Sequence, residues 1–362
     1  MSRAGKGVLI MAGGTGGHIF PGLAVAEVLR KQNIPVRWLG AEGGMETRTV
    51  PAAGIPLDVV AITGLRGKGL MRWITMPLKL LRAVWQARRL LEANRPGCAV
   101  SFGGYAAAPG GIAAWTKGIP VLVHEQNRIP GLTNRLLTRF ARKILQGFPG
   151  TFPQELSAID SGNPVRHEVA ALDEPQTRLA GRSGPVRVLV TGGSQGAQVL
   201  NQVVPAAFKV LSSTTSVEIR HQAGAKRVDE ATEAYATAGV KAEITPFISD
   251  MAEAYSWADL VICRSGALTV AELATAGVAS VLVPFAFAVD DHQTRNAEYL
   301  ADAGAAVILS QSSVDPQILA TALQPLLSDR SVLLSMAIAA RQKALPDAAE
   351  KVVDACQEWV AP

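Results

Sequence analysis

Short apolar runs alternate with longer stretches of helical periodicity through the first half of the chain. The runs lie at 8–12, 36–40, 98–102, 120–125 and 143–148, and stretches such as 21–32 and 131–143 repeat apolar residues every three or four positions. Apolar runs separated by helical stretches are typical of parallel strands that helices connect. The first half is therefore predicted to form a parallel sheet with helices on both faces.

The second half repeats this alternation. Its apolar runs lie at 186–192, 216–224, 242–248, 260–266, 279–285 and 305–310, and a helix is predicted over 266–276. The chain is predicted to be an α/β protein of two Rossmann-like, doubly wound domains facing across a cleft. Turn residues and mixed charges between Asp160 and Gly184 indicate a boundary, with the linker at 162–164. The predicted domains are 1–162 and 163–340, and 341–362 is a candidate to cross back to the first domain.

Two glycine-rich turns, GGTGGH at 13–18 and GGSQGA at 192–197, each follow a predicted strand and open a helix. Such a turn leaves backbone N–H groups unpaired at the start of a helix, where the helix dipole also favours an anion. Neither turn spells GxGxxG, and the chain lacks GxxxxGK[ST], so neither a dinucleotide fold nor a P-loop is indicated. We expect the two turns to serve one ligand in the cleft.

The first half of the chain is basic, and the second half is acidic. Of 362 residues, 48% are hydrophobic and 18% charged, which fits two ordinary domains. Residues 1–160 hold 20 Lys/Arg and 8 Asp/Glu, a net charge of 20 − 8 = +12, so the total of +5 leaves 5 − 12 = −7 for the remainder. The basic half is a candidate surface for phosphates, nucleic acid or anionic lipid, or a solvated face without a partner.

Cysteine usage and the N-terminus favour the cytoplasm. Cys98, Cys263 and Cys356 lie far apart without a CxxC pair, which argues against a disulfide framework and a zinc site and predicts buried thiols. The first apolar run is too short for a signal peptide. The uncharged stretch 96–116 is long enough for a membrane span, but its glycines and Pro109 predict a strand, a loop and a helix instead.

Residues 64–95 are unusually basic, with eight Lys/Arg and only Glu92 as an acid. Trp73, Trp85 and neighbouring leucines at helical spacing predict either a basic amphipathic surface for an anionic membrane or a core-packing helix whose basic side faces water. Two tryptophans beside so many cations favour the membrane. Nucleic-acid binding is not predicted, because no recognition motif or aromatic platform is present.

Several polar residues stand at strand ends or helix starts and are candidates for chemistry. His18 follows the first turn and is the best placed proton acceptor, although it could instead cap or orient the helix. Glu125, in HEQN after the strand 120–125, is either a base or a structural acceptor. Tyr105 is a candidate for substrate contact rather than for catalysis. Glu272 is either solvated or an acceptor for ribose hydroxyls, and Gln293 and Asn296 suit hydroxyl recognition. No metal site is predicted, because no DxD motif or spaced His/carboxylate set occurs.

Eight motifs in order, GGTGGHIFP, GGYAAAPGG, HEQN, GNPVR, GGSQGA, FISDM, CRSGALTVAE and DHQTRNA, closely resemble the MurG family of bacterial peptidoglycan glycosyltransferases over nearly the whole chain. The resemblance implies the glycosyltransferase B fold and the inverting transfer of N-acetylglucosamine from UDP-N-acetylglucosamine to undecaprenyl-linked lipid I, giving lipid II. It implies no cofactor, a peripheral place on the cytoplasmic face of the inner membrane, and cell-wall synthesis proteins as candidate partners. Ser101 and Phe102 depart from the family pattern, which often has a glycine and a smaller residue there.

The resemblance also assigns residues. The second domain would hold the donor, with Ser194 at the diphosphate, Ile248 at uracil and Gln293 at the sugar. The residues that would contact the phosphates and the ribose are Ala267, Leu268, Thr269, Val270, Ala271 and Glu272. Thr15, Gly16, Gly17 and Asn127 would close on the donor from the first domain, and Arg166 would lie near the cleft. The first turn is also a candidate for the acceptor diphosphate. Either His18 or Glu125 would be the base for the C4 hydroxyl of the muramoyl sugar.

Three other functions are compatible with parts of the sequence. A UDP-sugar glycosyltransferase with another lipid or small acceptor would use the same donor residues. A UDP-N-acetylglucosamine 2-epimerase would share the architecture but has no need of the basic, tryptophan-bearing segment 64–95. A non-catalytic nucleic-acid-binding protein would explain the basic half but not the glycine turns.

Overall fold

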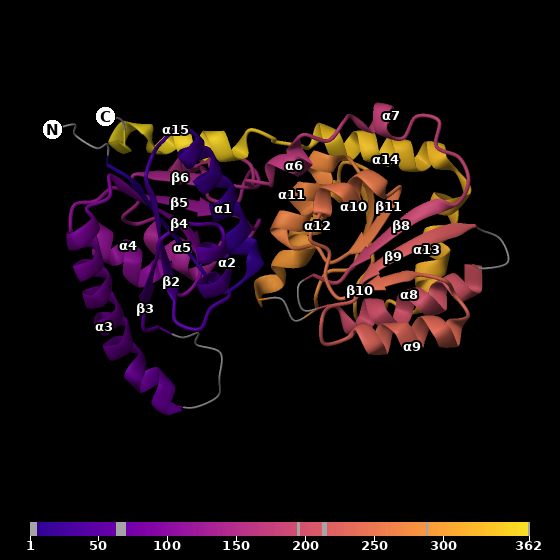
Figure 1. Cartoon of the computed structure of the whole chain (residues 1–362), viewed down its shortest axis with the longest axis horizontal. Coiled ribbons are helices and arrows are strands. Elements are labelled where there is room, and N and C mark those ends of the chain that lie inside the picture. The colour runs from indigo at the N-terminus through magenta and orange to yellow at the C-terminus, as the bar shows by residue number, and fades with distance from the viewer. Residues whose placement is uncertain (1–5, 63–69, 194–195, 212–215, 287–288, 361–362) are drawn as a thin grey trace. The chain divides into compact units, whose positions relative to one another are not determined.

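The computed structural model describes residues 6–62, 70–193, 196–211, 216–286 and 289–360, with the backbone alone for 70–76 and 289. The chain divides into two compact units (Figure 1), one of residues 1–166 with 345–362 and one of residues 167–344. Residues 162–164, expected to be a linker, belong to the first unit.

The first unit is built on a seven-stranded sheet in the order β3-β2-β1-β4-β5-β6-β7, and its neighbouring strands are parallel. The predicted parallel sheet of the first half is confirmed. The edge strands β3 and β7 were not predicted, because both are short and include an aspartate. The elements are β1 Val8–Ala12, α1 Gly16–Lys31, β2 Val36–Ala41, α2 Glu46–Ala52, β3 Leu57–Val60, α3 Leu70–Asn94, β4 Cys98–Gly103, α4 Ala107–Thr116, β5 Val121–Glu125, α5 Leu132–Leu137, β6 Lys143–Gln146, the 3₁₀ turn Gln154–Leu156, β7 Ile159–Asp160 and α15 Ala348–Val360.

The second unit has a six-stranded parallel sheet in the order β10-β9-β8-β11-β12-β13. The predicted repeat of the α/β pattern is confirmed. The elements are α6 His167–Ala170, α7 Pro175–Arg178, β8 Val186–Thr191, α8 Gln198–Leu211, β9 Val217–Gln222, α9 Val228–Ala238, β10 Glu243–Thr245, α10 Met251–Trp257, β11 Leu260–Cys263, α11 Ala267–Ala276, β12 Ala279–Leu282, the 3₁₀ turn Val289–Asp291, α12 His292–Ala301, β13 Ala306–Ile308, α13 Pro316–Ser328 and α14 Arg330–Gln342.

The last helix, α15, belongs to the first unit although it follows the whole second unit in sequence. It lies with α1 (Figure 1, yellow and indigo). Val352, Val353 and Cys356 of α15 are fully buried in the same core as Val8 and Ile10 of β1. Each valine buried in this way contributes about 1.5–3 kcal/mol, so α15 is a part of that core.

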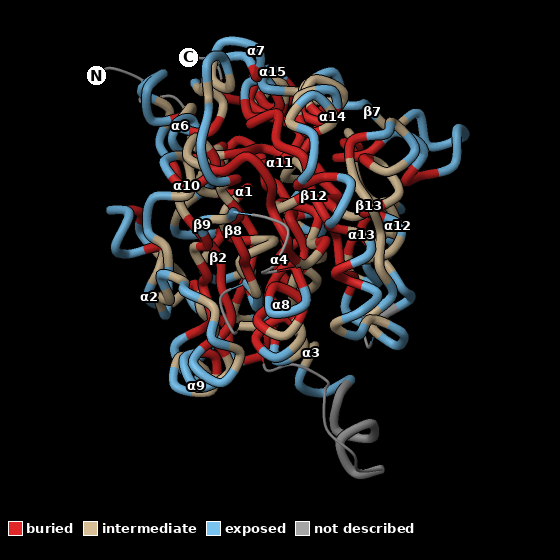
Figure 2. The backbone as a smooth tube through the Cα atoms, turned by 90° about the vertical axis from the view of Figure 1, so that its right-hand side faces the viewer, coloured by how far each residue is buried: buried red, intermediate tan, exposed pale blue. Residues whose placement is uncertain are grey.

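The central strands carry the core of each unit. In β1, β5 and β11 every residue is buried. Figure 2 shows the buried residues in red, gathered in the interior of the molecule. Strands covered by helices on both faces have no solvent side, which is why they read as continuous apolar runs. Cys98, Cys263 and Cys356 are buried free thiols, as predicted.

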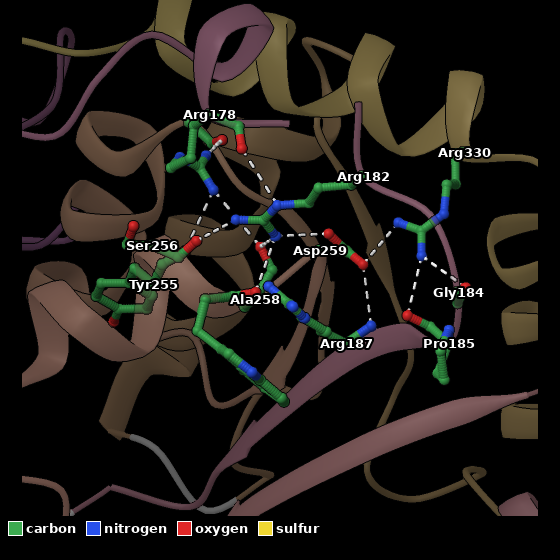
Figure 3. Close-up of polar contacts among 12 residues, drawn as sticks. Arg178, Arg182, Gly184, Pro185, Arg187, Tyr255, Ser256, Ala258, Asp259 and Arg330 are labelled. Carbon is green, nitrogen blue, oxygen red and sulfur yellow. Dashed lines mark hydrogen bonds and ion pairs between the residues drawn. The ribbon is translucent and has the colours of Figure 1, made fainter. Parts of the chain in front are cut away.

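A cluster of arginines around Asp259 ties the second unit together at the edge where its strands begin (Figure 3). The carboxylate of Asp259 accepts hydrogen bonds from Arg182 (2.6 Å), Arg330 (2.8 Å) and the backbone N–H of Arg187 (3.0 Å). Arg182 also donates to the carbonyl of Trp257 at the end of α10. Arg330 donates to the carbonyl of Pro185. Asp259 precedes β11, so this cluster lies at the opposite edge of the sheet from the glycine turn that follows β8.

Candidate active site

The first glycine turn joins β1 to α1 and packs directly on the turn that follows β4. A Cβ on Gly104 would lie 2.3 Å from the carbonyl oxygen of Gly13, and a Cβ on Gly103 would lie 3.2 Å from the His18 ring. Both Gly103 and Gly104 have positive φ, 97° and 91°. Glycine is therefore required at both positions, and the two turns form one surface beside His18.

His18, the third residue of α1, is half-buried and bonded to the HEQN motif. Its Nδ1 lies 2.8 Å from Oε1 of Gln126. Nε2 of Gln126 lies 3.0 Å from Nδ1 of His124 and 2.8 Å from the backbone oxygen of His124. Nε2 of His124 lies 2.9 Å from the carbonyl oxygen of Gly162, in the GNPVR motif. One chain of contacts therefore links three motifs from distant parts of the sequence and ends at His18.

His124 is the buried member of this chain of contacts. Its side chain is fully buried, and burial lowers its pKa to about 4 despite the hydrogen bond to Gly162. Its ring also packs on Phe102, with ring centroids 5.2 Å apart. His124 is therefore neutral at neutral pH and serves as a fixed part of the site.

Glu125 accepts four hydrogen bonds from N–H groups. Oε1 accepts from the backbone N–H and side-chain amide of Asn127, at 2.9 and 3.1 Å, and Oε2 accepts from the backbone N–H of Gly131 and the amide of Asn134, at 3.0 and 2.9 Å. The residue is 1% exposed. A carboxylate has about four lone-pair sites, and here four donors use them. Of the two roles considered for Glu125, the geometry favours the structural acceptor.

Asn134 and Ser101 extend this buried network towards β4. Ser101 Oγ donates to Oδ1 of Asn134 at 2.9 Å, and the amide of Asn134 also donates to the carbonyl of His124 at 3.1 Å. Ser101 and Phe102, the two positions that depart from the family pattern, are fully buried. The departures therefore lie beneath the glycine pair rather than on its surface.

A second buried carboxylate, Glu46 at the start of α2, lies under the first glycine turn. Its Oε2 accepts from the backbone N–H of Gly14 at 3.0 Å, and its Oε1 accepts from Ala41 at 2.9 Å. A Cβ on Gly13 would lie 2.2 Å from Oε1 of Glu46. The expectation that this turn leaves its N–H groups unpaired is wrong for Gly14, whose N–H already binds a carboxylate.

The remaining residues assigned to the first domain differ in exposure. Thr15 is the exposed residue before α1, and its side chain makes no capping hydrogen bond. Tyr105 is half-buried and packs against an apolar cluster. Asn127 is half-buried beside Glu125, and the guanidinium of Arg166 lies 5.3 Å from the ring of Phe20 on α1. Gly16 and Gly17, the first two residues of α1, are half-buried.

In the second unit, the start of α11 offers backbone donors. Its N-cap residue is Gly266, which has no side chain to cap the helix. The N–H of Val270 donates to the carbonyl of Gly266 at 3.0 Å. The N–H groups of residues 267–269 precede this bond and lie where the helix dipole favours an anion. The side chains of Ala267, Leu268 and Val270 are buried, so in this range contact with a ligand falls to the backbone, to Thr269 and to Ala271.

Glu272 is 3% exposed, and its Oε2 accepts a hydrogen bond from the hydroxyl of Tyr255 at 3.1 Å. The alternative that Glu272 is a solvated carboxylate is therefore wrong. A carboxylate that already receives one hydroxyl has the chemistry expected of a hydroxyl acceptor.

Other predicted donor residues are placed as follows. Gln293 in α12 is half-buried, and its Oε1 accepts from the backbone N–H of Phe285 at 2.9 Å. Ile248 is half-buried before α10. Asn296 is fully buried and donates to the carbonyl of Ser265, which makes it a support of the α11 turn. Ser194 lies outside the described residues.

The α3 surface, defined as Leu78, Leu81 and Trp85 on α3 with Trp115 on α4, is apolar and exposed. The four side chains are 70%, 65%, 52% and 51% exposed. The guanidinium of Arg89 stacks 3.5 Å from the ring of Trp85. The opposite face of α3 packs through Ala83, Ala87 and Leu91. The side chain of Trp73 lies outside the described residues. None of the helices in the described ranges is long and apolar enough to span a membrane.

Some functional candidates were missed from sequence. Neither Gln126 nor His124 of the HEQN motif was predicted as a functional residue by itself, and Glu46 has no sequence pattern that distinguishes it from a surface residue. Arg264, just before the α11 turn, donates to the carbonyls of Val283 (2.9 Å) and Pro284 (3.2 Å), and burial lowers its pKa only to about 10. It is therefore charged at neutral pH and favours an anion at this end of the sheet.

Comparison with known proteins covers both units. Residues 8–146 match the glycosyltransferase family 28 N-terminal domain, and residues 187–352 match the glycosyltransferase family 28 C-terminal domain. The chain is 60% identical over 347 residues to the UDP-N-acetylglucosamine--N-acetylmuramyl-(pentapeptide) pyrophosphoryl-undecaprenol N-acetylglucosamine transferase of Xanthomonas axonopodis pv. citri (strain 306), with 96% of this chain and 80% of that protein covered.

An enzyme of the same name from Marinobacter nauticus (strain ATCC 700491 / DSM 11845 / VT8) is 53% identical over 350 residues, which cover 97% of this chain and 96% of that protein. Among solved structures, the crystal structure of Acinetobacter baumannii MurG matches with a TM-score of 0.84 and 44% identity, covering 98% of this chain and 99% of that one.

Proposed function

Because the chain belongs to glycosyltransferase family 28, and within it to the MurG family, we propose that it transfers N-acetylglucosamine from UDP-N-acetylglucosamine to lipid I, forming lipid II. The fold is the glycosyltransferase B fold. The high identity over nearly the whole length of these relatives carries this proposal.

His18 is proposed as the general base. Its Nε2 takes the proton from the C4 hydroxyl of the muramoyl sugar, and the oxygen attacks the anomeric carbon of the donor. The bond from that carbon to the diphosphate breaks, UDP leaves with the electron pair, and the configuration inverts. This role is supported by the half-buried position of His18 and by its single described side-chain partner on Nδ1. Glu125 is a poorer base because four donors already use its oxygens.

The second unit is proposed to bind the donor, with the diphosphate at the N–H groups that open α11, near Arg264, and the ribose hydroxyls at Glu272. Helix starts and charge-assisted hydrogen bonds are suited to these two groups. The contacts predicted for Thr15, Gly16, Gly17, Asn127, Arg166, Ser194, Ile248 and Gln293 remain predictions.

Glu272 can be tested with nucleotides alone. Glu272→Gln replaces an acceptor of two hydroxyls by a weaker one, so UDP should bind about tenfold less tightly, a loss of about 1.4 kcal/mol. Calorimetry with UDP and with 2′,3′-dideoxy-UDP measures the effect. The parent should prefer UDP, and the variant should lose most of this preference; an equal preference in both would contradict the ribose contact.

The α3 surface is proposed to contact an anionic membrane, which brings the enzyme to its lipid-linked acceptor. Exposed Leu and Trp side chains flanked by Lys79, Arg82 and Arg89 fit the interface of such a membrane. The enzyme would then act as a peripheral protein on the cytoplasmic face of the inner membrane.

The function is tested by following UDP release from UDP-N-acetylglucosamine with and without a lipid I analogue, with the glycan product weighed by mass spectrometry. We expect release only with the acceptor, and a product heavier by one N-acetylhexosamine. UDP release without acceptor, or isomerisation of the sugar, would favour a 2-epimerase. Donor binding with transfer only to another acceptor would keep the donor site and overturn the choice of lipid I.

A further inference from the structure

The contacts that end at His18 have one consistent direction of proton donation. The carbonyl of Gly162 can only accept, so the proton of His124 is on Nε2, and Nδ1 of His124 is an acceptor. The amide of Gln126 faces both that Nδ1 and the carbonyl of His124, two acceptors, so the group placed there is the NH₂. The amide oxygen of Gln126 therefore faces His18.

This orientation decides which nitrogen of His18 carries the proton. Oε1 of Gln126 can only accept, and it lies 2.8 Å from Nδ1 of His18. Nδ1 of His18 is therefore the donor, and the lone pair of the neutral ring is on Nε2. If the amide of Gln126 were flipped, its oxygen would face the carbonyl and Nδ1 of His124, which are both acceptors. The flipped amide is therefore unfavourable, and so is the Nε2–H tautomer of His18 that would need it.

We propose that Gln126 and His124 are positioning residues that hold His18 in the Nδ1–H tautomer, so that Nε2 is the base in every turnover. This inference rests on the proposed function, in which His18 takes the proton of the acceptor hydroxyl. Neither residue touches the reacting atoms; each acts through the next. Burial supports the role, because His124 and Gln126 are both almost completely buried and water does not compete for their bonds.

The anchor of the chain is the turn at Gly162. Its φ is +82°, and a Cβ there would lie 2.6 Å from Cβ of Leu345, in the segment that leads into α15. Asn163, the next residue, donates from its amide to the backbone oxygen of Gln126 at 2.9 Å. The GNPVR motif therefore fixes both the first acceptor of the chain and the backbone of Gln126.

The charged side chains on the neighbouring elements have described partners other than His18. Glu46 on α2 bonds to Gly14, Glu125 on β5 bonds to Asn134, and Arg166 lies over Phe20 of α1. Each is the same in the parent and in the variants below, so a comparison between them isolates Gln126.

The first experiment reads the tautomer without using activity. The full chain is labelled with ¹⁵N-histidine, which reports five histidines, and the His18 signals are assigned by their loss in His18→Gln. At a pH where the ring is neutral, we expect protonated Nδ1 and unprotonated Nε2. Protonation on Nε2 in the parent would overturn the inference without any variant of Gln126.

The second experiment removes or charges the acceptor. Without this acceptor, the neutral ring of His18 in Gln126→Leu should shift towards the Nε2–H tautomer that free imidazole prefers. We expect kcat to fall about 10- to 100-fold, as it does when a histidine loses its orienting partner elsewhere. Gln126→Glu keeps an acceptor for Nδ1 of His18 and its charge stabilises the imidazolium, while its second oxygen replaces the NH₂ group that donates to His124. Its kcat should recover towards that of the parent at high pH, with the acidic limb of the pH–rate profile moved up by about 1–3 pH units.

Gln86→Glu is the matched control, because it adds the same charge to the first unit at a side chain that bonds to Ala61 and not to a histidine. Its profile should equal that of the parent. An unchanged tautomer and kcat in Gln126→Leu would overturn the role of Gln126. If the parent has the expected tautomer but His18→Gln turns over normally, the base assignment of the proposed function fails, while the measured tautomer stands.

Discussion

At the scale of single residues, hydrogen-bond partners separate His18 from Glu125. The bonds of His18 reach one ring nitrogen, whereas the bonds of Glu125 reach both carboxylate oxygens and order the loop from Asn127 to Asn134. A group that transfers protons needs an unoccupied lone pair, and a group that orders a loop needs its lone pairs filled. The two residues therefore differ in what their loss should change.

His18→Gln should lower activity but not stability, whereas Glu125→Gln should lower the free energy of unfolding. His18→Gln should lower kcat by about 10²–10⁴ with unchanged donor affinity and unfolding midpoint. Glu125→Gln puts an NH₂ group against N–H donors, so its unfolding free energy should drop by about 1–3 kcal/mol. Steady-state kinetics and urea unfolding of both variants measure this. Normal turnover in His18→Gln together with a stable but inactive Glu125→Gln would exchange the two roles.

At the scale of elements, α3 exposes apolar side chains that a buried helix would hide. Leu78, Leu81 and Trp85 share one face by their spacing, and Ala83 and Ala87 pack the other. The alternative of a core-packing helix accounts for the second face but not for the first.

Removing two of these side chains should weaken membrane binding but not chemistry. Leu81→Ser with Trp85→Ser should cost about 3 kcal/mol of partitioning, or roughly 100-fold, into phosphatidylglycerol-containing vesicles. Sedimentation with vesicles measures binding, and a water-soluble acceptor measures kcat, which should not change. Val210→Ser, an exposed valine on α8, is the control. Equal sedimentation of the double variant and this control would remove α3 from the membrane contact.

The arginine cluster in Figure 3 joins the ends of elements through one carboxylate. Asp259 is 2% exposed; burial alone would raise its pKa, but the bonds from Arg187, Arg182 and Arg330 hold that pKa below its ordinary 3.8. The stability that it contributes is present above that unfolded value and is lost as the pH falls below it.

Asp259→Asn should therefore destabilise the second unit by about 3 kcal/mol at neutral pH, because two guanidinium groups lose their counter-charge. Urea unfolding at pH 7 measures this. Glu27→Gln, which removes the exposed pair with Lys31 on α1, should cost less than about 0.5 kcal/mol. If the two variants lost the same stability, the cluster would be no more than an exposed ion pair.

At the scale of the whole molecule, each unit has one buried histidine in a hydrogen-bonded chain. His221 in β9 bonds to Tyr235 (3.0 Å) and Asn201 (3.1 Å), and burial lowers the pKa of His124 and of His221 to about 4. Both are neutral in the folded state and become charged in the unfolded chain near pH 6.5. Between pH 6.5 and 4 the unfolded state binds more protons, so the stability of both units falls as the pH falls.

His221→Gln should flatten this dependence. The parent should lose up to about 3 kcal/mol per buried histidine between pH 6.5 and 4, from the difference of the two pKa values. The variant should be less stable at pH 7.5 but should lose less on acidification. Urea unfolding at four pH values gives the slopes, with the exposed His167→Gln as control. Equal slopes in the parent and His221→Gln would mean that His221 does not titrate on unfolding.

The sequence by itself determined the two parallel sheets, the glycine turns at their strand ends and the basic amphipathic segment. These features depend on neighbours close in the chain: apolar runs form buried strands, and glycine permits the turns. The return of the last helix to the first domain was a candidate from sequence, but only the tertiary structure decided the boundary after Arg166, the core contacts of α15, and the surroundings of His18.

The reason is that the decisive contacts join positions that no local pattern relates. His18 and Gln126 are 108 positions apart, and His124 and Gly162 are 38 positions apart. A histidine, a glutamine or a buried glutamate such as Glu46 reads the same in a sequence whether water or another side chain meets it. Which nitrogen of His18 carries its proton depends on the direction of a buried amide, and packing alone sets that direction.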